Sequence, residues 1–336
     1  MALVAAGVAC LPSAAAAKAV KVTSLPVAFQ VKNTNTTEAP GCTPDGATYT
    51  VRGHLTAPAK GKRSGVTLYL HGLGLGEWLW NFQQVKSYNF VAGMARLGNH
   101  SVTVDRLGYG ASDKPPDGKS TCIGSQADVA HQIVGHLKAG SYTVQGGTAR
   151  KFKRVGLVGH SAAGQISITE AYTYADLKAL VVVGFSYSNL PRGNDEFGFQ
   201  RIACDAGGDP VKGLVNYGFF GRTEAGFRST MFRSAPKAVQ DAGVKLHYAD
   251  PCGDNYSLID TIQKQAANVP KVRVPVLVVC GTKDVLYAPF GCEAQAERFR
   301  KGRSLILRNT GHGVPLERSA KTFRKRLSRF LDRSGL

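Results

Sequence analysis

The sequence has few acidic residues and no long apolar run. It contains 23 Asp and Glu against 42 Lys and Arg, which gives a formal net charge of +19. No run approaches the roughly 18 to 20 apolar residues that a membrane-spanning helix needs, so no transmembrane segment is expected. The cysteines also lack the paired CxxC spacing of zinc sites. We therefore expect neither a metal nor another cofactor.

The basic residues gather in short runs. These runs lie at residues 60–63, 150–154 and 298–303 and in the C-terminal segment. A positive field of this size attracts anionic surfaces and anionic substrates. The runs carry no nucleic-acid-binding motif and no aromatic residues arranged to stack on bases. We expect a solvated basic surface that associates weakly with anionic surfaces, and no nucleic-acid partner.

Residues 1–17 are small and apolar, and they end in a run of alanines before Lys18. This pattern is typical of a secretory signal peptide with a small-residue cleavage site. A basic residue near Met1 is missing, so either the true start lies upstream or the segment is not a signal peptide. We predict a protein that is secreted or lies in the cell envelope.

The cysteines favour the same compartment. Removal of residues 1–17 takes away Cys10 and leaves six cysteines, an even set that fits disulfides in an oxidising environment. Six cysteines can pair in many ways, and buried free thiols are the alternative. Pairing of cysteines that lie near each other in the sequence gives Cys204–Cys252 and Cys280–Cys292, and leaves Cys42–Cys122.

Strand and helix patterns alternate along most of the chain. Residues 18–47 are polar and predict an extended lead-in. From 48 to 186, short apolar runs alternate with amphipathic segments, as in a parallel sheet that helices cover on both faces. The alternation stops in the Gly-rich segment 187–269, which we interpret as an inserted cap, and it resumes in 270–336. The sequence predicts one α/β domain with this insertion.

One predicted strand, residues 154–158, runs almost directly into a serine. The sequence there is Gly159-His160-Ser161-Ala162-Ala163-Gly164, and a helical segment follows. The small residues around Ser161 suit a tight strand-to-helix turn that projects a serine. Such a turn requires strained backbone angles. The alternative is an ordinary strand–loop–helix junction with a surface serine.

A serine nucleophile needs a base, and the base needs a group that fixes its tautomer. Groups that follow different strands of a parallel sheet meet at one edge. His312 follows the last predicted strand, so it is the expected base. His160 neighbours the serine, but we expect its side chain to point away from it.

Asp284 is the expected third group. It is the only acid in the turn after the strand pattern 274–279. The alternatives are Asp195 and Glu196, which lie some residues beyond another strand. An ordinary turn residue is the other interpretation of Asp284, because Asp is common in turns. A Cys280–Cys292 disulfide would clamp the loop that carries it.

Attack by a serine on a carbonyl group also needs N–H donors that stabilise the resulting oxyanion. The N–H of Ala162 follows the nucleophile, and the N–H of Leu73 lies in the Gly-rich loop after the strand pattern 66–70. We predict these two as the donors. His71 and Gly72 are interpreted as structural residues that let this loop turn tightly.

These motifs together resemble the α/β-hydrolase superfamily from about residue 48 to 331. The resemblance implies an eight-stranded, mostly parallel sheet with helices on both faces and a cap after the sixth strand. One departure is Ala163, where many members have glycine. Ser161, Asp284 and His312 follow one another in the order Ser, Asp, His that is found in that family. The matching pieces are His71-Gly72, residues 105–112, Gly159 to Gly164, Gly281 to Asp284, and Gly311-His312 with Glu317 beyond.

The resulting hypothesis is a secreted serine hydrolase that cleaves a small-molecule or lipid-like carboxylic ester through an acyl-enzyme. Hydrolysis of thioester, lactone, amide or C–C bonds remains open, because the same fold and triad serve all of them. A non-catalytic binding protein of the cell envelope is the rival class.

Overall fold

The structure is a computed structural model that describes residues 20–37, 39–61, 64–188 and 191–336. The predicted signal peptide, with Cys10, lies outside the described residues. The strands are β1 (Val22–Lys32), β2 (Thr48–Pro58), β3 (Gly65–Leu70), β4 (Ser101–Val104), β5 (Thr143–Val144), β6 (Arg154–His160), β7 (Ala179–Val183), β8 (Tyr217–Gly218), β9 (Asp250–Pro251), β10 (Val276–Gly281) and β11 (Gly302–Leu307).

In the described part of the chain, the central sheet has nine strands in the order β11-β10-β7-β6-β3-β4-β2-β1-β5. The strands from β11 to β4 pair parallel, whereas β2, β1 and β5 add antiparallel. The expected mostly parallel sheet is confirmed. It has one strand more than the eight expected, because the two-residue strand β5 pairs with β1.

The lead-in predicted at 18–47 contributes more than an extended segment. Its residues Val22–Lys32 form β1, which pairs with β2 over the full length of both strands. Val27, Phe29 and Val31 are buried, and the residues between them face outward. This alternation is that of a strand with one covered face, and the polar composition of the segment as a whole concealed it.

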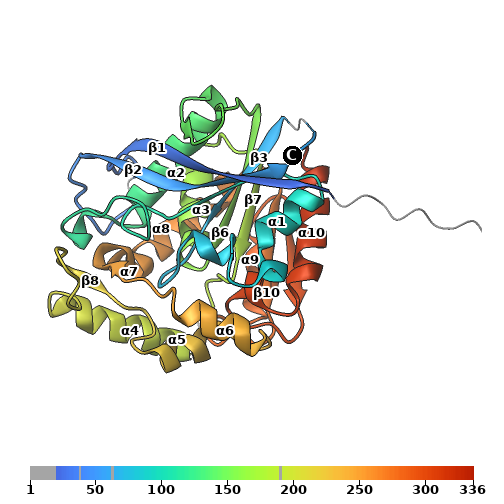
Figure 1. Ribbon diagram of the computed structural model, residues 1–336. Helices are drawn as coiled ribbons and strands as arrows, with labels where there is room; N and C mark the ends of the chain where they lie inside the picture. The colour runs from blue at the N-terminus through green and yellow to red at the C-terminus, as the bar shows by residue number, and fades with distance from the viewer. Residues whose placement is uncertain (1–19, 38, 62–63, 189–190) are drawn as a thin grey trace, which may run out of the picture.

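Two groups of helices cover the two faces of the sheet. Along β7, Leu180 and Val182 belong to the core beneath α2, α3 and α9, whereas Val181 and Val183 belong to the core beneath α1 and α10. Figure 1 shows α1 and α10 side by side. The helices are α1 (Phe90–Arg96), α2 (Ile123–Ala139), α3 (Ala162–Thr173), α4 (Pro191–Asp205), α5 (Glu224–Met231), α6 (Lys237–Val244), α7 (Cys252–Asp260), α8 (Ile262–Asn268), α9 (Gly291–Glu297) and α10 (Ala320–Arg333).

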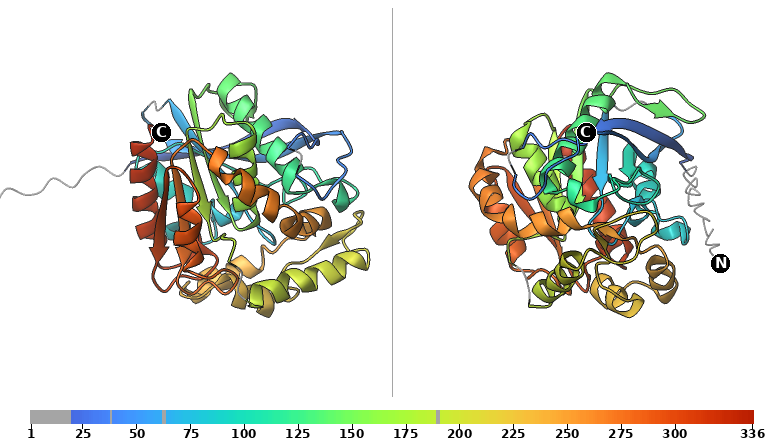
Figure 2. Two further views of the ribbon diagram at one scale, coloured as in Figure 1. Left: turned by 180° about the vertical axis from the view of Figure 1, so that it is seen from behind. Right: turned by 90° about the vertical axis from the view of Figure 1, so that its left-hand side faces the viewer.

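Residues 187–269, the predicted cap, hold α4 to α8 and the small antiparallel pair β8–β9. In Figure 1, α4, α5 and α6 form a layer across one end of the sheet, and both views of Figure 2 show the same layer. Helix α7 contacts α2, and α8 contacts α3, so these two helices join the cap to the core. None of the helices in the described ranges is long and apolar enough to cross a membrane.

The structure contains three disulfides with the pairing expected from sequence proximity. They join Cys42 to Cys122, Cys204 to Cys252 and Cys280 to Cys292, with Cα–Cα distances of 5.5, 5.5 and 6.0 Å. The second lies within the predicted cap, and the third spans the loop between β10 and α9.

Candidate active site

Ser161 occupies the turn between β6 and α3 in a strained conformation. Its φ of 55° and ψ of −122° lie in a region that residues with a Cβ rarely adopt. Two backbone hydrogen bonds hold the turn: Ser161 N–H donates to Val183 O at 2.8 Å, and Gly164 N–H donates to Ser161 O at 2.7 Å. The expected tight elbow is therefore present, and the first of these bonds anchors it to the neighbouring strand β7.

The small residues around Ser161 are required by close backbone approach. A Cβ at Gly159 would lie 2.0 Å from the carbonyl oxygen of Ala163, and a Cβ at Gly164 would lie 2.9 Å from Phe185 Cβ. A Cβ at Gly72 would lie 2.6 Å from Ser161 Cβ. Gly72 thus lets the loop after β3 pass directly against the serine.

His312 and Asp284 meet beside this turn. His312 Nδ1 lies 2.9 Å from Asp284 Oδ2, and both side chains are about 1% exposed. The carboxylate can only accept here, so Nδ1 carries the proton and Nε2 is left as a proton acceptor. The other oxygen of Asp284 accepts from Leu286 N–H at 2.9 Å. The aspartate is held from both sides and fixes the tautomer of the histidine.

Tyr287 is a neighbour of the site that the sequence analysis did not single out. Its ring stacks on His312 with the centroids 5.9 Å apart, and its hydroxyl contacts Ser161. Burial and the nearby Asp284 raise the pKa of Tyr287, so the phenol stays neutral. In the described residues no direct hydrogen bond joins Ser161 to His312. Its position in the sequence, three residues after Asp284, was the feature that could have indicated a place for Tyr287 near the site.

The two predicted oxyanion donors lie where the loop after β3 meets the start of α3. Among the hydrogen bonds of the described residues, the N–H groups of Leu73 and Ala162 have no acceptor. Both residues are almost fully buried. A buried N–H without a partner is costly unless a ligand atom completes it, which is what an oxyanion site requires.

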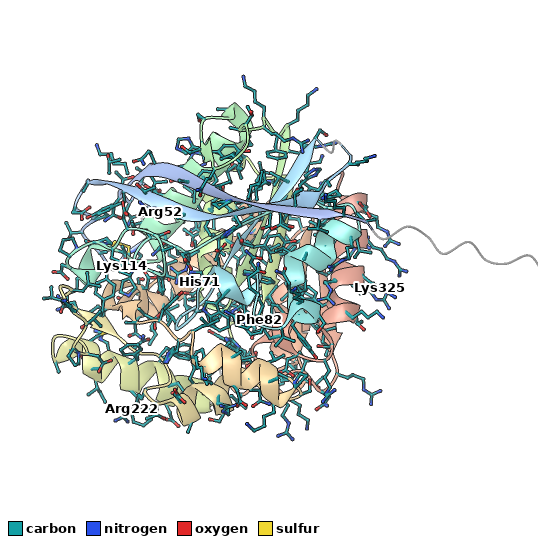
Figure 3. The ribbon with its side chains drawn as sticks, in the orientation of Figure 1. Arg52, His71, Phe82, Lys114, Arg222 and Lys325 are labelled. Carbon is teal, nitrogen blue, oxygen red and sulfur yellow. A yellow bond between two sulfur atoms is a disulfide. The ribbon has the colours of Figure 1, made fainter. Side chains whose placement is uncertain are left out.

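His71 fixes the shape of this loop. Arg106 N–H donates to His71 Nε2 at 3.0 Å, so the proton sits on Nδ1, which donates to Gly72 O at 2.9 Å. Burial and the nearby guanidinium of Arg106 hold the pKa of His71 well below its usual value, and the ring is neutral. His71 thus connects the backbone at Gly72 to the backbone at Arg106. Figure 3 labels His71 near the centre of the view, and its side chain is fully buried.

Two buried carboxylates from the predicted cap hold the same loop. Asp254 on α7 accepts from Arg106 at 2.6 Å, while Arg106 also donates to His71 O at 2.8 Å. Asp250 accepts from Gly74 N–H at 2.6 Å. Burial raises the pKa of Asp250 to about 7. The loop that carries Leu73 is therefore fixed by side chains that lie far away in the sequence.

His160 does not point away from the site, so that expectation is wrong. Its Nε2 lies 2.8 Å from the carbonyl oxygen of His312, and the two rings are 4.7 Å apart. Because β6 ends in a turn that reverses the chain, the side chain before Ser161 faces the loop after β11. The carbonyl can only accept, so His160 donates through Nε2 and holds the backbone of His312.

The loop of His312 has a second anchor in Glu317. This fully buried carboxylate accepts from Arg233 N–H at 2.7 Å and from Ser234 N–H at 2.6 Å. Gly313 N–H donates to Met231 O at 2.7 Å. Met231 ends α5, and Arg233 and Ser234 follow it, so the end of α5 and the segment between α5 and α6 are tied to the loop that presents the histidine.

The pattern of the alpha/beta hydrolase family matches residues 68–325. The chain belongs to the alpha/beta hydrolase family. No curated protein matches the sequence of this hydrolase. Residues 68–325 contain Ser161, Asp284 and His312, so the matched range includes the whole candidate site.

Solved structures resemble this hydrolase over nearly its full length. An esterase from Thermogutta terrifontis covers 92% of this chain and 100% of its own, with 17% identity and a TM-score of 0.59. A bromoperoxidase from Bacillus anthracis covers 91% of this chain and 99% of its own, with 17% identity and a TM-score of 0.63. The enol-lactonase from Burkholderia xenovorans covers 84% and 97%, with 16% identity and a TM-score of 0.61. At these identities the likeness shows the fold, and not the substrate.

One group of side chains in the hydrolase has the donors for a cation. The ligand atoms of His131, Glu170 and Asp176 lie within 4.8 Å of one another. Lys138 Nζ, 2.9 Å from Asp176, already balances that carboxylate. Burial raises the pKa of Glu170 well above its usual value, so a proton balances the second carboxyl. Lys138 and this proton thus balance the charge of the two carboxyl groups.

Proposed function

We propose that this protein is a serine hydrolase that cleaves carboxylic esters through an acyl-enzyme. Ser161 is the nucleophile, His312 the base and Asp284 the group that orients the base. The N–H groups of Ala162 and Leu73 hold the oxyanion. The observation that carries the proposal is the buried His312–Asp284 hydrogen bond of 2.9 Å at the edge of the sheet where Ser161 sits on its strained turn.

In the proposed reaction, Ser161 Oγ attacks the ester carbonyl as His312 Nε2 takes its proton. The negative charge that develops on the carbonyl oxygen is stabilised by the two N–H donors, which need no reorganisation because the loop and the helix start are fixed. The imidazolium then protonates the leaving alkoxide. Water, activated by the same histidine, hydrolyses the acyl-enzyme and restores the serine.

The hydroxyl of Tyr287 adds a step to this scheme. It contacts Ser161 in the free enzyme, and Ser161 is only 4% exposed. Substrate entry therefore requires that the side chains above the serine, Tyr287 among them, move aside. The direct contact between Ser161 and His312 forms in that step, since catalytic hydrogen bonds are often long before substrate binds.

The type of bond that is cleaved is inferred from the similar structures and not from the geometry of the triad. The similar structures include proteins described as esterases and an enol-lactonase, so a lactone is the nearest alternative to an open-chain ester. Thioester, amide and C–C hydrolysis use the same groups. A fold that serves only for binding, for example to an anionic envelope polymer, is disfavoured by buried groups arranged for proton transfer.

A fluorophosphonate probe separates the enzyme from the binding protein. We expect the wild type to be labelled and Ser161→Ala to remain unlabelled while both keep the same circular dichroism. Failure to label folded wild-type protein would contradict the proposal. With p-nitrophenyl esters of increasing chain length and a set of lactones, the same pair of proteins then assigns the substrate class.

We also propose that the mature protein is exported. The three disulfides are typical of oxidising compartments, and residues 1–17 have the composition of a signal peptide. Expression of the full chain with a C-terminal tag should give a mature N-terminus close to Lys18 in the culture fluid. Intact Met1 on intracellular protein with free thiols would contradict export.

A further inference from the structure

A cavity lies between the edge strand β11 and the helix α10, and no residue of the proposed triad lines it. Its volume is about 600 Å³, within the range of small-molecule sites. In Figure 2 (left), the red helix α10 and the red strand beside it lie together at one edge of the molecule. The cavity thus occupies the edge of the sheet formed by the last strand and the last helix.

The floor of this cavity is apolar. Leu277 on β10, Leu305 on β11 and Phe330 on α10 line it, and all three pack against the core that α10 covers. Leu305 and Phe330 are half-buried. Such a surface gains from burying hydrocarbon, at roughly 25 cal/mol for each Å² removed from water.

The rim of the cavity is strongly basic. Lys301, Arg303, Arg326, Arg329 and Arg333 line it, and no acidic side chain does. All five are exposed. In the described part of the chain none of them belongs to a salt bridge. Five cations around one hollow repel one another, and an anion placed among them relieves that repulsion.

We infer that the cavity between β11 and α10 binds an amphiphilic anion, which has a single alkyl or acyl chain and a carboxylate or phosphate head group. The chain lies on Leu277, Leu305 and Phe330, and the head group meets Arg326 and Arg329. Guanidinium groups suit both head groups because their forked N–H donors match paired oxygens. The inference does not depend on the proposed triad, since the two sites share no residue.

Charged side chains over an edge strand also have a purely protective explanation. Lysines and arginines there prevent two sheets from pairing edge to edge. That role needs neither an apolar hollow nor a cluster of cations around it, and it makes no difference between ligands. Binding measurements therefore distinguish the two explanations.

The test is calorimetric titration of the full chain with decyl phosphate below its micelle concentration. Arg326→Ala/Arg329→Ala should weaken binding by roughly tenfold or more, because two charge-assisted contacts are lost. The matched control is Lys321→Ala/Lys325→Ala, which removes the same charge from exposed positions of α10 that do not line the cavity. Figure 3 labels Lys325 at the outer rim of the molecule. The control should bind within about twofold of the wild type, since Lys321 and Lys325 do not line the cavity and exposed charges without direct contact to the ligand are partly screened by salt.

Four results would overturn the inference. Equal losses in the two double variants would show attraction by net charge alone. Equal binding of inorganic phosphate and decyl phosphate would show that the apolar floor contributes nothing. Binding to vesicles that contain anionic lipid, with none to monomeric decyl phosphate, would assign the surface to membrane association instead. Full retention of binding by Arg326→Ala/Arg329→Ala would place the ligand elsewhere, including the site of Ser161.

Discussion

The α/β core and the inserted segment contribute to the candidate site in different ways. The core presents Ser161, Asp284 and His312 from the ends of β6, β10 and β11, so sheet topology determines where they lie. The inserted segment contributes Asp250 and Asp254, which bind the loop after β3. The core thus places the candidate catalytic groups through its backbone, whereas the inserted segment fixes the loop after β3 through two buried carboxyl groups. Removing a core residue should therefore abolish chemistry, whereas removing an inserted carboxylate should loosen the scaffold.

Among the residues that the core presents, we expect Asp284→Asn to cause a very large loss of turnover. The amide can donate to His312 Nδ1, which favours the tautomer with a proton on Nε2, and that tautomer cannot accept from Ser161. We expect kcat to fall by roughly 10³- to 10⁴-fold, with little loss of thermal stability. The measurement is ester hydrolysis under saturating substrate, beside a melting curve.

Asp113→Asn is the control for this change, because Asp113 pairs with Arg52 on the surface. It should leave turnover unchanged. Similar turnover in Asp284→Asn and the wild type would show that Asp284 is not the acid of the triad. Asp195 and Glu196 would then be the candidates for that role.

Asp254→Ala tests the contribution of the inserted segment to stability. Arg106 loses its buried partner, and the hydroxyl of Tyr109 loses its acceptor. An unpaired buried guanidinium typically costs about 3 to 5 kcal/mol of unfolding free energy. We expect a loss of this size in urea denaturation. Asp241→Ala, which removes surface pairs with Lys237 and Arg228, should change the midpoint very little, because exposed ion pairs contribute little. An equally small change for Asp254→Ala would show that α7 does not stabilise the loop.

Asp250 makes the same scaffold sensitive to pH. Burial raises its pKa to about 7 in the folded protein, against about 3.9 in an unfolded chain. The raised value means that folding favours the protonated form, so this contribution to stability is complete below pH 4 and is lost as the pH rises toward about 7. Three pKa units correspond to about 4 kcal/mol.

Asp250→Asn removes this titration. The unfolding free energy of the wild type minus that of the variant should decrease between about pH 4 and pH 7 and stay constant above that range. Subtraction cancels the other carboxylates that both proteins share. A difference that does not vary with pH would show that Asp250 is ionised throughout and that its three donors, from Gly74, Gln200 and Phe220, outweigh its burial.

The sequence predicted the parts of the structure that are local patterns. Apolar runs identified the strands of the core, and a serine, an acid and a histidine just beyond three of them identified the candidate triad. The contacts that fix these groups join distant segments: Arg106 and Asp254 are 148 positions apart. No spacing or composition rule connects two such positions, so the carboxylates that hold the loop could not be predicted. The strand Val22–Lys32 was concealed for a related reason, since its partner β2 determines which of its faces is covered.

His160 gives the smallest and sharpest test, because it belongs to the core but acts as the inserted carboxylates do. It touches no substrate in the proposed reaction and holds the carbonyl of His312 from Nε2. Burial holds its pKa well below the usual value, so it stays neutral and its charge cannot explain an effect. We expect His160→Gln, whose amide can still donate, to keep turnover within about threefold, and His160→Phe to lower kcat by roughly tenfold through loss of one hydrogen bond.

The decisive measurement for His160 is how kcat depends on pH, and not how large kcat is. If the hydrogen bond positions His312 against Asp284, His160→Phe should shift the acidic limb of the profile, which reports the base, while His160→Gln restores it. A merely structural role would lower stability in both variants and leave the limb in place. Loss of stability without a shifted limb would therefore assign His160 to packing against Trp80, and the site would depend on the sheet alone for the placement of its base.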